Sequence, residues 1–288
     1  MTADSAAWLD TATTERDGES GIVRSASVVG ERLGRYRLVR RIGAGAMGCV
    51  YEAYDPLLER AVAIKVPRPG GTADRLRSEA KALARLVHPN VISVHDVGEL
   101  EGRSFVVLEL VEGLTLREWL GAERRSFLAI VDVLVAAGRG LAAVHAVGLV
   151  HRDFKPDNVV VGHDERVRVV DFGIASAATS SDGQVAGTPA YMAPEQRIGI
   201  AVSALADQFS FCVVLWEALF GERPYHKADL LKLRAGDRAV LPCAPSREHY
   251  VPAWLSQLIA RGLMIEAHAR HPSMGALLDA IELGLAAE

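Results

Sequence analysis

Cysteine is scarce in this 288-residue chain, and its three cysteines, Cys49, Cys212 and Cys243, lie far apart. A disulfide framework needs paired cysteines, and a structural zinc site needs closely spaced ligands. The cysteine pattern therefore favours neither kind of stabilisation. It indicates a protein whose thiols stay reduced.

Long uninterrupted apolar runs are also missing, although half of the residues are hydrophobic. The most apolar stretch, Phe127 to Val150, is broken by Asp132, Arg139 and His145, so a buried helix explains it better than a bilayer span. Residues 1–10 carry no basic cluster ahead of an apolar core, which argues against a secretory signal. We therefore expect a chain without a membrane segment that works in the cytoplasm.

No block of lysine and arginine stands out along the chain, in which 32 basic residues face 36 acidic ones and the formal net charge is -4. A protein that binds a phosphate backbone usually shows a basic patch or stripe. Nucleic acid is therefore not an expected partner.

The chain changes in character along its length. Residues 1–33 are rich in serine, threonine and acidic residues, which is typical of a flexible tail. After Glu112 the pattern turns to long apolar helices, Phe127 to Ala146 and Ala204 to Phe220, of which the second is apolar on nearly every face and is expected at the centre of a core. Before that point, one helix, Thr72 to Val87, interrupts short β-rich runs. The expected strands are Tyr36 to Arg40, Cys49 to Tyr54, Ala61 to Val66, Val91 to Val97 and Ser104 to Leu110.

These patterns predict an α+β domain over residues 34–285. Its N-terminal lobe, residues 34–111, is expected to be β-rich with one major helix, and its C-terminal lobe, residues 114–285, to be mainly helical.

A glycine-rich segment runs from Gly43 to Val50. Where side chains are absent, backbone N–H groups can approach phosphate oxygens closely. An ordinary glycine hairpin would show the same pattern. Because Cys49 to Tyr54 continues as a strand and does not open a helix, the segment favours a hairpin folded over a nucleotide rather than a dinucleotide-binding loop.

Lys65 lies at the end of an apolar strand, where its ammonium needs an anionic partner such as the phosphate of ATP. In the following helix Glu79 shares a stripe with Leu76, Ala80 and Leu83. An unpaired inward carboxylate would be costly, so a Lys65–Glu79 ion pair would satisfy both groups. The alternative is that Glu79 is a solvated residue at the edge of the stripe.

Three further segments carry the strongest signal. They are His151-Arg152-Asp153-Phe154-Lys155-Pro156-Asp157-Asn158, Asp171-Phe172-Gly173 and Gly187 to Glu195. With the glycine loop and Lys65, in this order and spacing, they resemble the eukaryotic-like (Hanks-type) protein kinases, and the resemblance covers residues 36 to about 285. It implies the bilobal protein-kinase fold and a serine/threonine protein kinase that transfers the γ-phosphoryl group of ATP to hydroxyls of protein substrates.

The resemblance also implies roles for single residues. Asp153 would orient the substrate hydroxyl and accept its proton, and Asn158 and Asp171 would hold Mg²⁺, which prefers oxygen ligands. Lys155 would contact the transferred phosphate, and Thr188 would support Asp153 and Lys155. Both are typical of serine/threonine kinases, although the Thr188 hydroxyl could also serve only its own turn.

ATP itself would be held by residues of the first lobe. The implied set is Ile42, Gly43, Ala44, Gly45, Ala46, Met47, Gly48, Cys49, Val50, Ala63, Lys65, Glu79, Glu109 and Val111. Ala63 is equally what ordinary strand packing would select. Cys49 is either a reactive thiol or a small buried hydrophobe.

The resemblance also bears on regulation. In this family an arginine at the position of Arg152 commonly binds a phosphate on the activation segment. This activation segment lies between Asp171 and Glu195, and within it Thr179, Ser180 and Ser181 stand among small residues. They are candidate autophosphorylation sites, and a transient dimer would allow phosphorylation in trans.

Other matches are structural. Glu195 and Arg270 resemble a buried ion pair of the family. Asp207 could accept N–H groups of the catalytic loop, residues 151–158, or merely cap its helix. Three departures from the family pattern put the local packing in doubt: Cys212 in place of Gly, His271 in place of Pro, and Glu266-Ala267 in place of Asp-Pro.

Two rival functions are weighed against a kinase. A pseudokinase, acting as an ATP-binding scaffold or regulatory module, would not need to keep all of Lys65, Glu79, Asp153, Asn158 and Asp171. A small-molecule phosphotransferase would not be expected to carry the segment Gly187 to Glu195. Bacterial members often continue into a linker, a membrane span and a sensor domain, so the chain could be a piece of a longer kinase.

Overall fold

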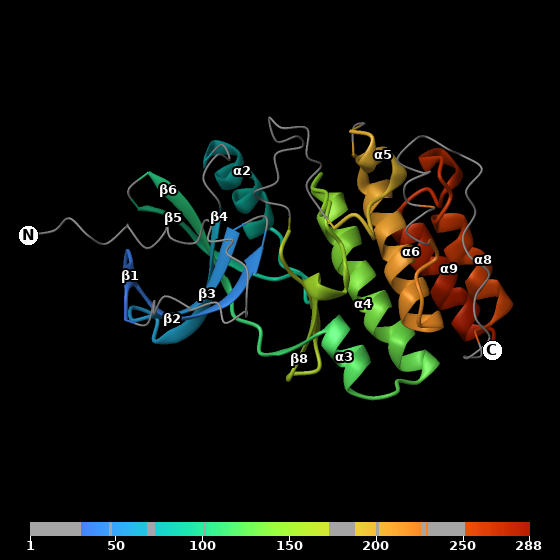
Figure 1. Cartoon of the computed structure of the whole chain (residues 1–288), viewed down its shortest axis with the longest axis horizontal. Coiled ribbons are helices and arrows are strands. Elements are labelled where there is room, and N and C mark those ends of the chain that lie inside the picture. The colour runs from blue at the N-terminus through green and yellow to red at the C-terminus, as the bar shows by residue number, and fades with distance from the viewer. Residues whose placement is uncertain are drawn as a thin grey trace, which may run out of the picture. The chain divides into compact units, whose positions relative to one another are not determined.

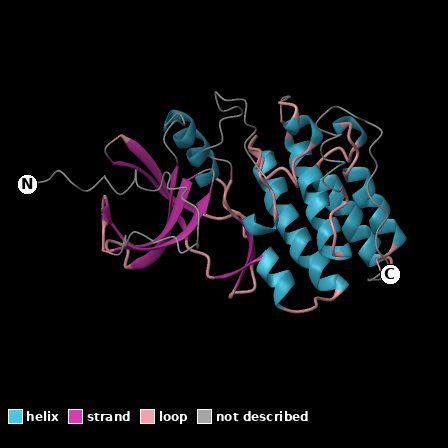
Figure 2. Cartoon of the chain, viewed as in Figure 1, coloured by secondary structure: helices cyan, strands magenta, loops and turns pink. Residues whose placement is uncertain are grey.

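The structure is a computed structural model, and it describes residues 30–45, 48–67, 73–100, 102–172, 188–199, 202–225, 229 and 251–288. The chain divides into two compact units. The β unit comprises Met1–Ala80 and Val94–Leu110, and the helical unit comprises Lys81–Ser93 and Val111–Glu288. Figure 2 shows strands gathered in the first unit and helices in the second.

The β unit is built on an antiparallel six-stranded sheet with the order β1-β2-β3-β4-β6-β5. Its apolar core includes Leu38, Val62, Ile64 and Phe105, all at most 5% exposed. The strands are β1 (Arg32–Leu33), β2 (Tyr36–Gly45), β3 (Gly48–Asp55), β4 (Arg60–Pro67), β5 (Val94–Leu100) and β6 (Arg103–Glu109), and the helix is α2 (Ala73–Ala84).

The glycine-rich segment is the end of the β2–β3 hairpin, in which Gly45 pairs with Gly48. Gly48 has a φ of 134°, and a Cβ placed on it would lie 2.2 Å from the carbonyl oxygen of Val66 in β4. Only glycine allows this approach of two backbones. The expected strand after the glycine loop is therefore present as β3.

One predicted strand was misplaced. The stretch from Val91 to Val97 was expected as a single strand, but β5 begins at Val94. Val91 instead forms an isolated parallel bridge with Val169, and the N–H of Ile92 donates to the carbonyl of Val169 at 3.1 Å. Val91 and Val94 are both apolar β-branched residues that indicate a strand. The sequence pattern therefore could not show which sheet each of them joins.

The helical unit contains a group of long helices, of which α4, α6, α8 and α9 lie side by side (Figure 1). A small antiparallel sheet with the order β7-β8-β9 accompanies them. The elements are β7 (Gly113–Thr115), α3 (Leu116–Ala122), α4 (Phe127–Ala146), η1 (Pro156–Asn158), β8 (Val159–Gly162), β9 (Val167–Val169), α5 (Pro194–Arg197), α6 (Ala204–Phe220), α8 (Ala253–Gly262), η2 (Ala267–Ala269) and α9 (Met274–Ala286).

Helix α6 is the central element of this unit, as its all-round apolar sequence predicted. Thirteen of its 17 residues are buried. Its ends are closed by the Ser203 hydroxyl, which accepts from the N–H of Leu205, and by Gly221 in the left-handed conformation. Such a helix offers a rigid base for any polar group that it carries.

Helix α4 is, among the described residues, the one helix whose length and composition would suit a membrane span. That is weak ground for a span, because core helices of globular proteins meet the same criteria. Nine of its residues are buried, and it packs against α6, α9 and β9.

Two of the departures from the family pattern, Cys212 and His271, are accommodated by local packing. Cys212 is fully buried, which raises the pKa of its thiol to about 12. Gly262, at the end of α8, leaves room for it, since a Cβ on Gly262 would lie 2.2 Å from the Cys212 Sγ. The ring of His271 lies 2.9 Å from the carbonyl oxygen of Leu258, and its backbone N–H donates to Gln208.

We predict that Gly262→Ala destabilises the protein by about 1 to 3 kcal/mol, because the added methyl group overpacks against Cys212. The double variant Cys212→Ala/Gly262→Ala should recover most of this loss, since the clashing sulfur is gone. Urea unfolding of the two single variants and the double variant measures the coupling. Additive losses would show that the two residues do not compete for the same space.

Candidate active site

The catalytic loop is anchored to α6 by one carboxylate. Asp207 is 1% exposed. Its Oδ2 accepts the backbone N–H of His151 at 2.7 Å, and its Oδ1 accepts that of Arg152 at 2.8 Å. The Nε2 of His145 lies 2.7 Å from the same Oδ2. Asp207 therefore binds the loop. The alternative was that Asp207 caps its own helix, but the N-cap residue of α6 is Ser203.

The loop needs such an anchor because its backbone is strained. Arg152, within the loop, has a φ of 67°, and Asp171, which follows β9 outside the loop, has a φ of 57°. This region is unfavourable for residues with a Cβ and costs on the order of 1 to 3 kcal/mol each. The carbonyl of Arg152 also accepts the side chain of Gln196 at 2.6 Å. Non-glycine residues in this conformation cluster at functional sites.

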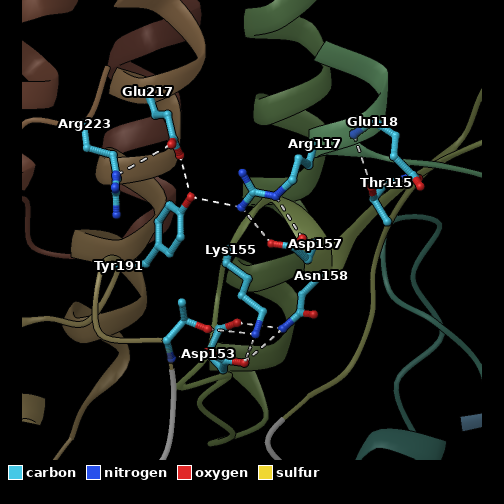
Figure 3. A network of polar contacts seen from close by, with 11 residues as sticks. Thr115, Arg117, Glu118, Asp153, Lys155, Asp157, Asn158, Tyr191, Glu217 and Arg223 are labelled. Atoms are coloured by element: carbon cyan, nitrogen blue, oxygen red, sulfur yellow. Dashed lines mark hydrogen bonds and ion pairs between the residues drawn. The ribbon is translucent and has the colours of Figure 1, made fainter. Parts of the chain in front are cut away.

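Asp153 is the centre of a compact polar cluster (Figure 3). Its Oδ2 accepts from the Lys155 Nζ at 2.7 Å, and its Oδ1 accepts the backbone N–H of Thr188 at 2.9 Å. The Lys155 Nζ also donates to the Thr188 hydroxyl at 2.9 Å. Thr188 thus contacts Asp153 through its backbone and Lys155 through its hydroxyl. The alternative, that this hydroxyl binds only its own turn, is wrong.

The two expected metal ligands stand at the same end of the β8–β9 hairpin. Asn158 directly precedes β8, and Asp171 is the second residue after β9. The N–H of Val170 donates to the carbonyl of Asn158 at 2.9 Å, which ties the two positions together. Phe172, which follows Asp171, is buried, and its ring lies 4.8 Å from that of His151.

The chemistry of these two side chains suits a hard divalent cation. The Asn158 Nδ2 donates to the Asp153 carbonyl at 2.8 Å and to its carboxylate at 3.3 Å. The amide is thereby oriented, and its Oδ1 accepts no hydrogen bond from the part of the chain that the structure describes. A carboxylate from Asp171 and an oriented amide oxygen are ligands of the kind that Mg²⁺ prefers.

A second polar network lies beside the first (Figure 3). Arg117 on α3 donates its Nε and Nη2 to the Asp157 carboxylate at 2.9 and 2.8 Å, and its Nη2 to the Tyr191 hydroxyl at 3.1 Å. Tyr191 donates to the Glu217 Oε2 at 2.6 Å. Hydrogen bonds from Arg117 hold the pKa of Asp157 below its usual value, while burial and Glu217 raise that of Tyr191 to about 12. At neutral pH Asp157 is ionised and Tyr191 is protonated.

Glu195 and Arg270 form the expected ion pair beneath these segments. The two guanidinium nitrogens of Arg270 donate to the two Glu195 oxygens at 2.7 and 2.8 Å. The side chain of Arg270 is fully buried and also donates to the carbonyls of Met264, Leu205 and Ile265. The pair joins α5 to the end of the helical unit.

Most of the residues expected to bind nucleotide belong to the β unit, whereas Val111 is the first residue of the second segment of the helical unit. Lys65 on β4 is 2% exposed, and Ala63 and Leu108 are also buried. Glu79 on α2 is half-buried with its Oε2 enclosed, and the Lys65–Glu79 ion pair stays a prediction. Ile42 is exposed, and Cys49, Val50, Glu109 and Val111 are partly buried. Gly43, Ala44 and Gly45 belong to β2.

Several predicted residues lie outside the described part of the chain. They are Ala46 and Met47 of the glycine loop and Thr179, Ser180 and Ser181 of the activation segment. The structure also places two residues beside the site that the sequence analysis did not identify, Arg117 and Glu217. Asp157 could have been noticed, because it stands between Lys155 and Asn158, but nothing in the sequence marks the arginine that binds it.

We predict that Glu195→Gln lowers the free energy of unfolding by about 3 to 5 kcal/mol, because it leaves the buried Arg270 charge without its carboxylate. The matched control is Glu282→Gln, which breaks the exposed ion pair with Arg139 and should cost at most about 1 kcal/mol. Urea unfolding measures both. Equal small losses would show that the buried pair is dispensable.

Comparisons with known proteins identify the family. The family described as the protein kinase domain matches residues 36–275. Serine/threonine-protein kinase PknE of Mycobacterium tuberculosis is 36% identical over 269 residues, covering 89% of this chain and 47% of that protein. PknA of the same organism is 38% identical over 270 residues, covering 86% of this chain and 61% of that protein. The chain thus spans about half the length of the curated relatives that it matches.

Solved structures show the same likeness. The crystal structure of the Mycobacterium tuberculosis PknI kinase domain has a TM-score of 0.71 and 28% identity, covering 90% of this chain and 99% of that chain. The α+β protein-kinase fold and the resemblance predicted from the motifs are confirmed. The chain belongs to the protein kinase family, and its relatives are bacterial serine/threonine kinases of the Hanks type.

Proposed function

We propose that this chain is an active serine/threonine protein kinase. The observation that carries the proposal is the contact of Asp153, Lys155 and Thr188, whose polar atoms lie within 2.9 Å of one another. A scaffold that only binds nucleotide would have no use for a carboxylate oriented by three separate donors. Lys155 and Thr188 are also the two residues that mark serine/threonine specificity by resemblance.

In the proposed reaction a substrate hydroxyl attacks the γ-phosphorus of ATP. The Asp153 carboxylate orients the hydroxyl and takes its proton while the bond between the γ-phosphorus and the β–γ bridging oxygen breaks and ADP leaves. Lys155, fixed between Asp153 and Thr188, donates to the transferred phosphoryl group and offsets its charge. The protein's contribution is positioning and electrostatics, and it forms no covalent intermediate.

Protein kinases use ATP with a divalent metal, and we propose that the metal is Mg²⁺, held by Asn158 and Asp171. When bound, it would neutralise charge on the phosphate groups. Asn158 would be ready for this role, since its Nδ2 is already engaged by Asp153.

A phosphate-dependent switch is supported by Arg152. Its Nε is buried and has no hydrogen-bond partner within the described residues. Unpaired buried donors are costly, and a phosphate would satisfy this one through charge-assisted bonds. We propose that autophosphorylation at Thr179, Ser180 or Ser181 supplies it, within a transient dimer, and that the kinase acts on cytoplasmic proteins.

Intact-mass analysis after incubation with ATP tests the proposal. The wild type should gain phosphates on serine or threonine in the presence of Mg²⁺, lose this ability with a chelator and regain it with added Mg²⁺. Asp171→Asn should gain none. Peptide mapping should place phosphates among Thr179, Ser180 and Ser181, and the triple alanine variant should phosphorylate a generic basic protein more slowly.

Two results would contradict parts of the proposal. A wild type that binds ATP but transfers no phosphate would point to a pseudokinase. Full activity of the triple alanine variant, produced without phosphatase or a partner kinase, would refute the switch.

A further inference from the structure

The network around Arg117 is not used by the proposed reaction, yet it adjoins the residues that are. Arg117 projects from α3, a helix begun by a capping box of Thr115 and Glu118. Its guanidinium makes three hydrogen bonds, two to Asp157 and one to Tyr191, all between 2.8 and 3.1 Å. Figure 3 shows the side chain reaching from its helix toward both partners.

Asp157 belongs to the catalytic loop and Tyr191 to the segment that carries Thr188, and these two segments contact each other at the site. Asp157 lies in η1 between Lys155 and Asn158. Tyr191 follows Thr188 by a single turn, in which its N–H donates to the Thr188 carbonyl at 3.0 Å. Arg117 therefore joins the catalytic loop to the Thr188 segment at a second place, beside the direct contact of Lys155 with Thr188.

The far side of this link is fixed to α6. The Tyr191 hydroxyl donates to Glu217, and the Tyr191 carbonyl accepts from the Ser210 hydroxyl at 2.8 Å. Tyr191 is only 5% exposed, so its ring has little freedom to move. Arg117 thus links Asp157 to Tyr191, whose position is fixed by α6.

We propose that Arg117 is a positioning residue for phosphoryl transfer: it clamps residues 153–158 to residues 188–191 and so keeps Lys155 in contact with Asp153 and Thr188. This inference rests on the proposed function. Positioning of this kind acts on rate, because small displacements of reacting groups cost large factors in transfer.

The geometry calls for arginine rather than lysine. The planar guanidinium binds both Asp157 oxygens and still reaches Tyr191, whereas an ammonium is a single point charge that cannot span the three acceptors. The Arg117 and Asp157 side chains are 49% and 45% exposed, so the ion pair contributes little to stability. A loss on mutation should therefore appear in turnover and not in folding.

The kinetic test compares Arg117→Gln, Arg117→Lys, Asp157→Asn and the double variant Arg117→Gln/Asp157→Asn with wild type. The matched control is Arg139→Gln, which removes an arginine from another exposed ion pair, with Glu282. We expect kcat to fall about tenfold in Arg117→Gln and Asp157→Asn, with the KM for ATP and the melting temperature close to those of the control. The double variant should lose no more than either single one, and Arg117→Lys should recover little.

Hydrogen exchange provides a readout that does not depend on activity. Amide exchange in peptides covering residues 153–158 and 188–192 should be faster in Arg117→Gln than in Arg139→Gln. If the wild type transfers no phosphate, the proposed function fails and the exchange result alone decides on the clamp.

Three outcomes would overturn the inference. They are a kcat of Arg117→Gln within about twofold of wild type, losses that multiply in the double variant, and exchange that matches the control.

Discussion

The hydrogen bonds that Asp207 accepts from the backbone of His151 and Arg152 hold the catalytic loop of the helical unit in place. Arg152 is in a conformation that a residue with a Cβ avoids, so the loop would relax without a fixed acceptor. That acceptor is a carboxylate enclosed in the core, at 2.7 and 2.8 Å from the two amide nitrogens. This buried side chain thus fixes the start of the loop that carries Asp153 and Lys155.

Helix α6 extends this support along one of its faces. Asp207, Ser210 and Glu217 are spaced by three and seven residues, which places them on the same side of a helix. Asp207 binds the catalytic loop, whereas Ser210 and Glu217 bind the carbonyl and hydroxyl of Tyr191. Both segments that meet at Asp153 are therefore positioned by the same rigid, buried element, and Arg117 adds a link between them from the solvent side.

Much of this arrangement could be predicted from the sequence. The bounds of α4 and α6 follow from long apolar periods. The motifs single out Asp153, Lys155, Asn158 and Thr188, which hydrogen bonds join in the structure. The start of β5 could not be predicted, because Val91 and Val94 look alike to a periodicity argument but pair with different sheets. Arg117 escaped notice for a related reason: an arginine on an amphipathic helix usually faces solvent, and only the fold brings Asp157 and Tyr191 to it.

The most direct test of this account is phosphoryl transfer by Asp207→Asn, compared with Asp132→Asn on the exposed side of α4. An amide has one acceptor oxygen in place of two, so the loop should lose an anchor while the fold remains. The account predicts that kcat falls about 100-fold in Asp207→Asn, with ATP binding and the helical content close to those of the control. A turnover within about twofold of the control would contradict the claim that this carboxylate organises the site.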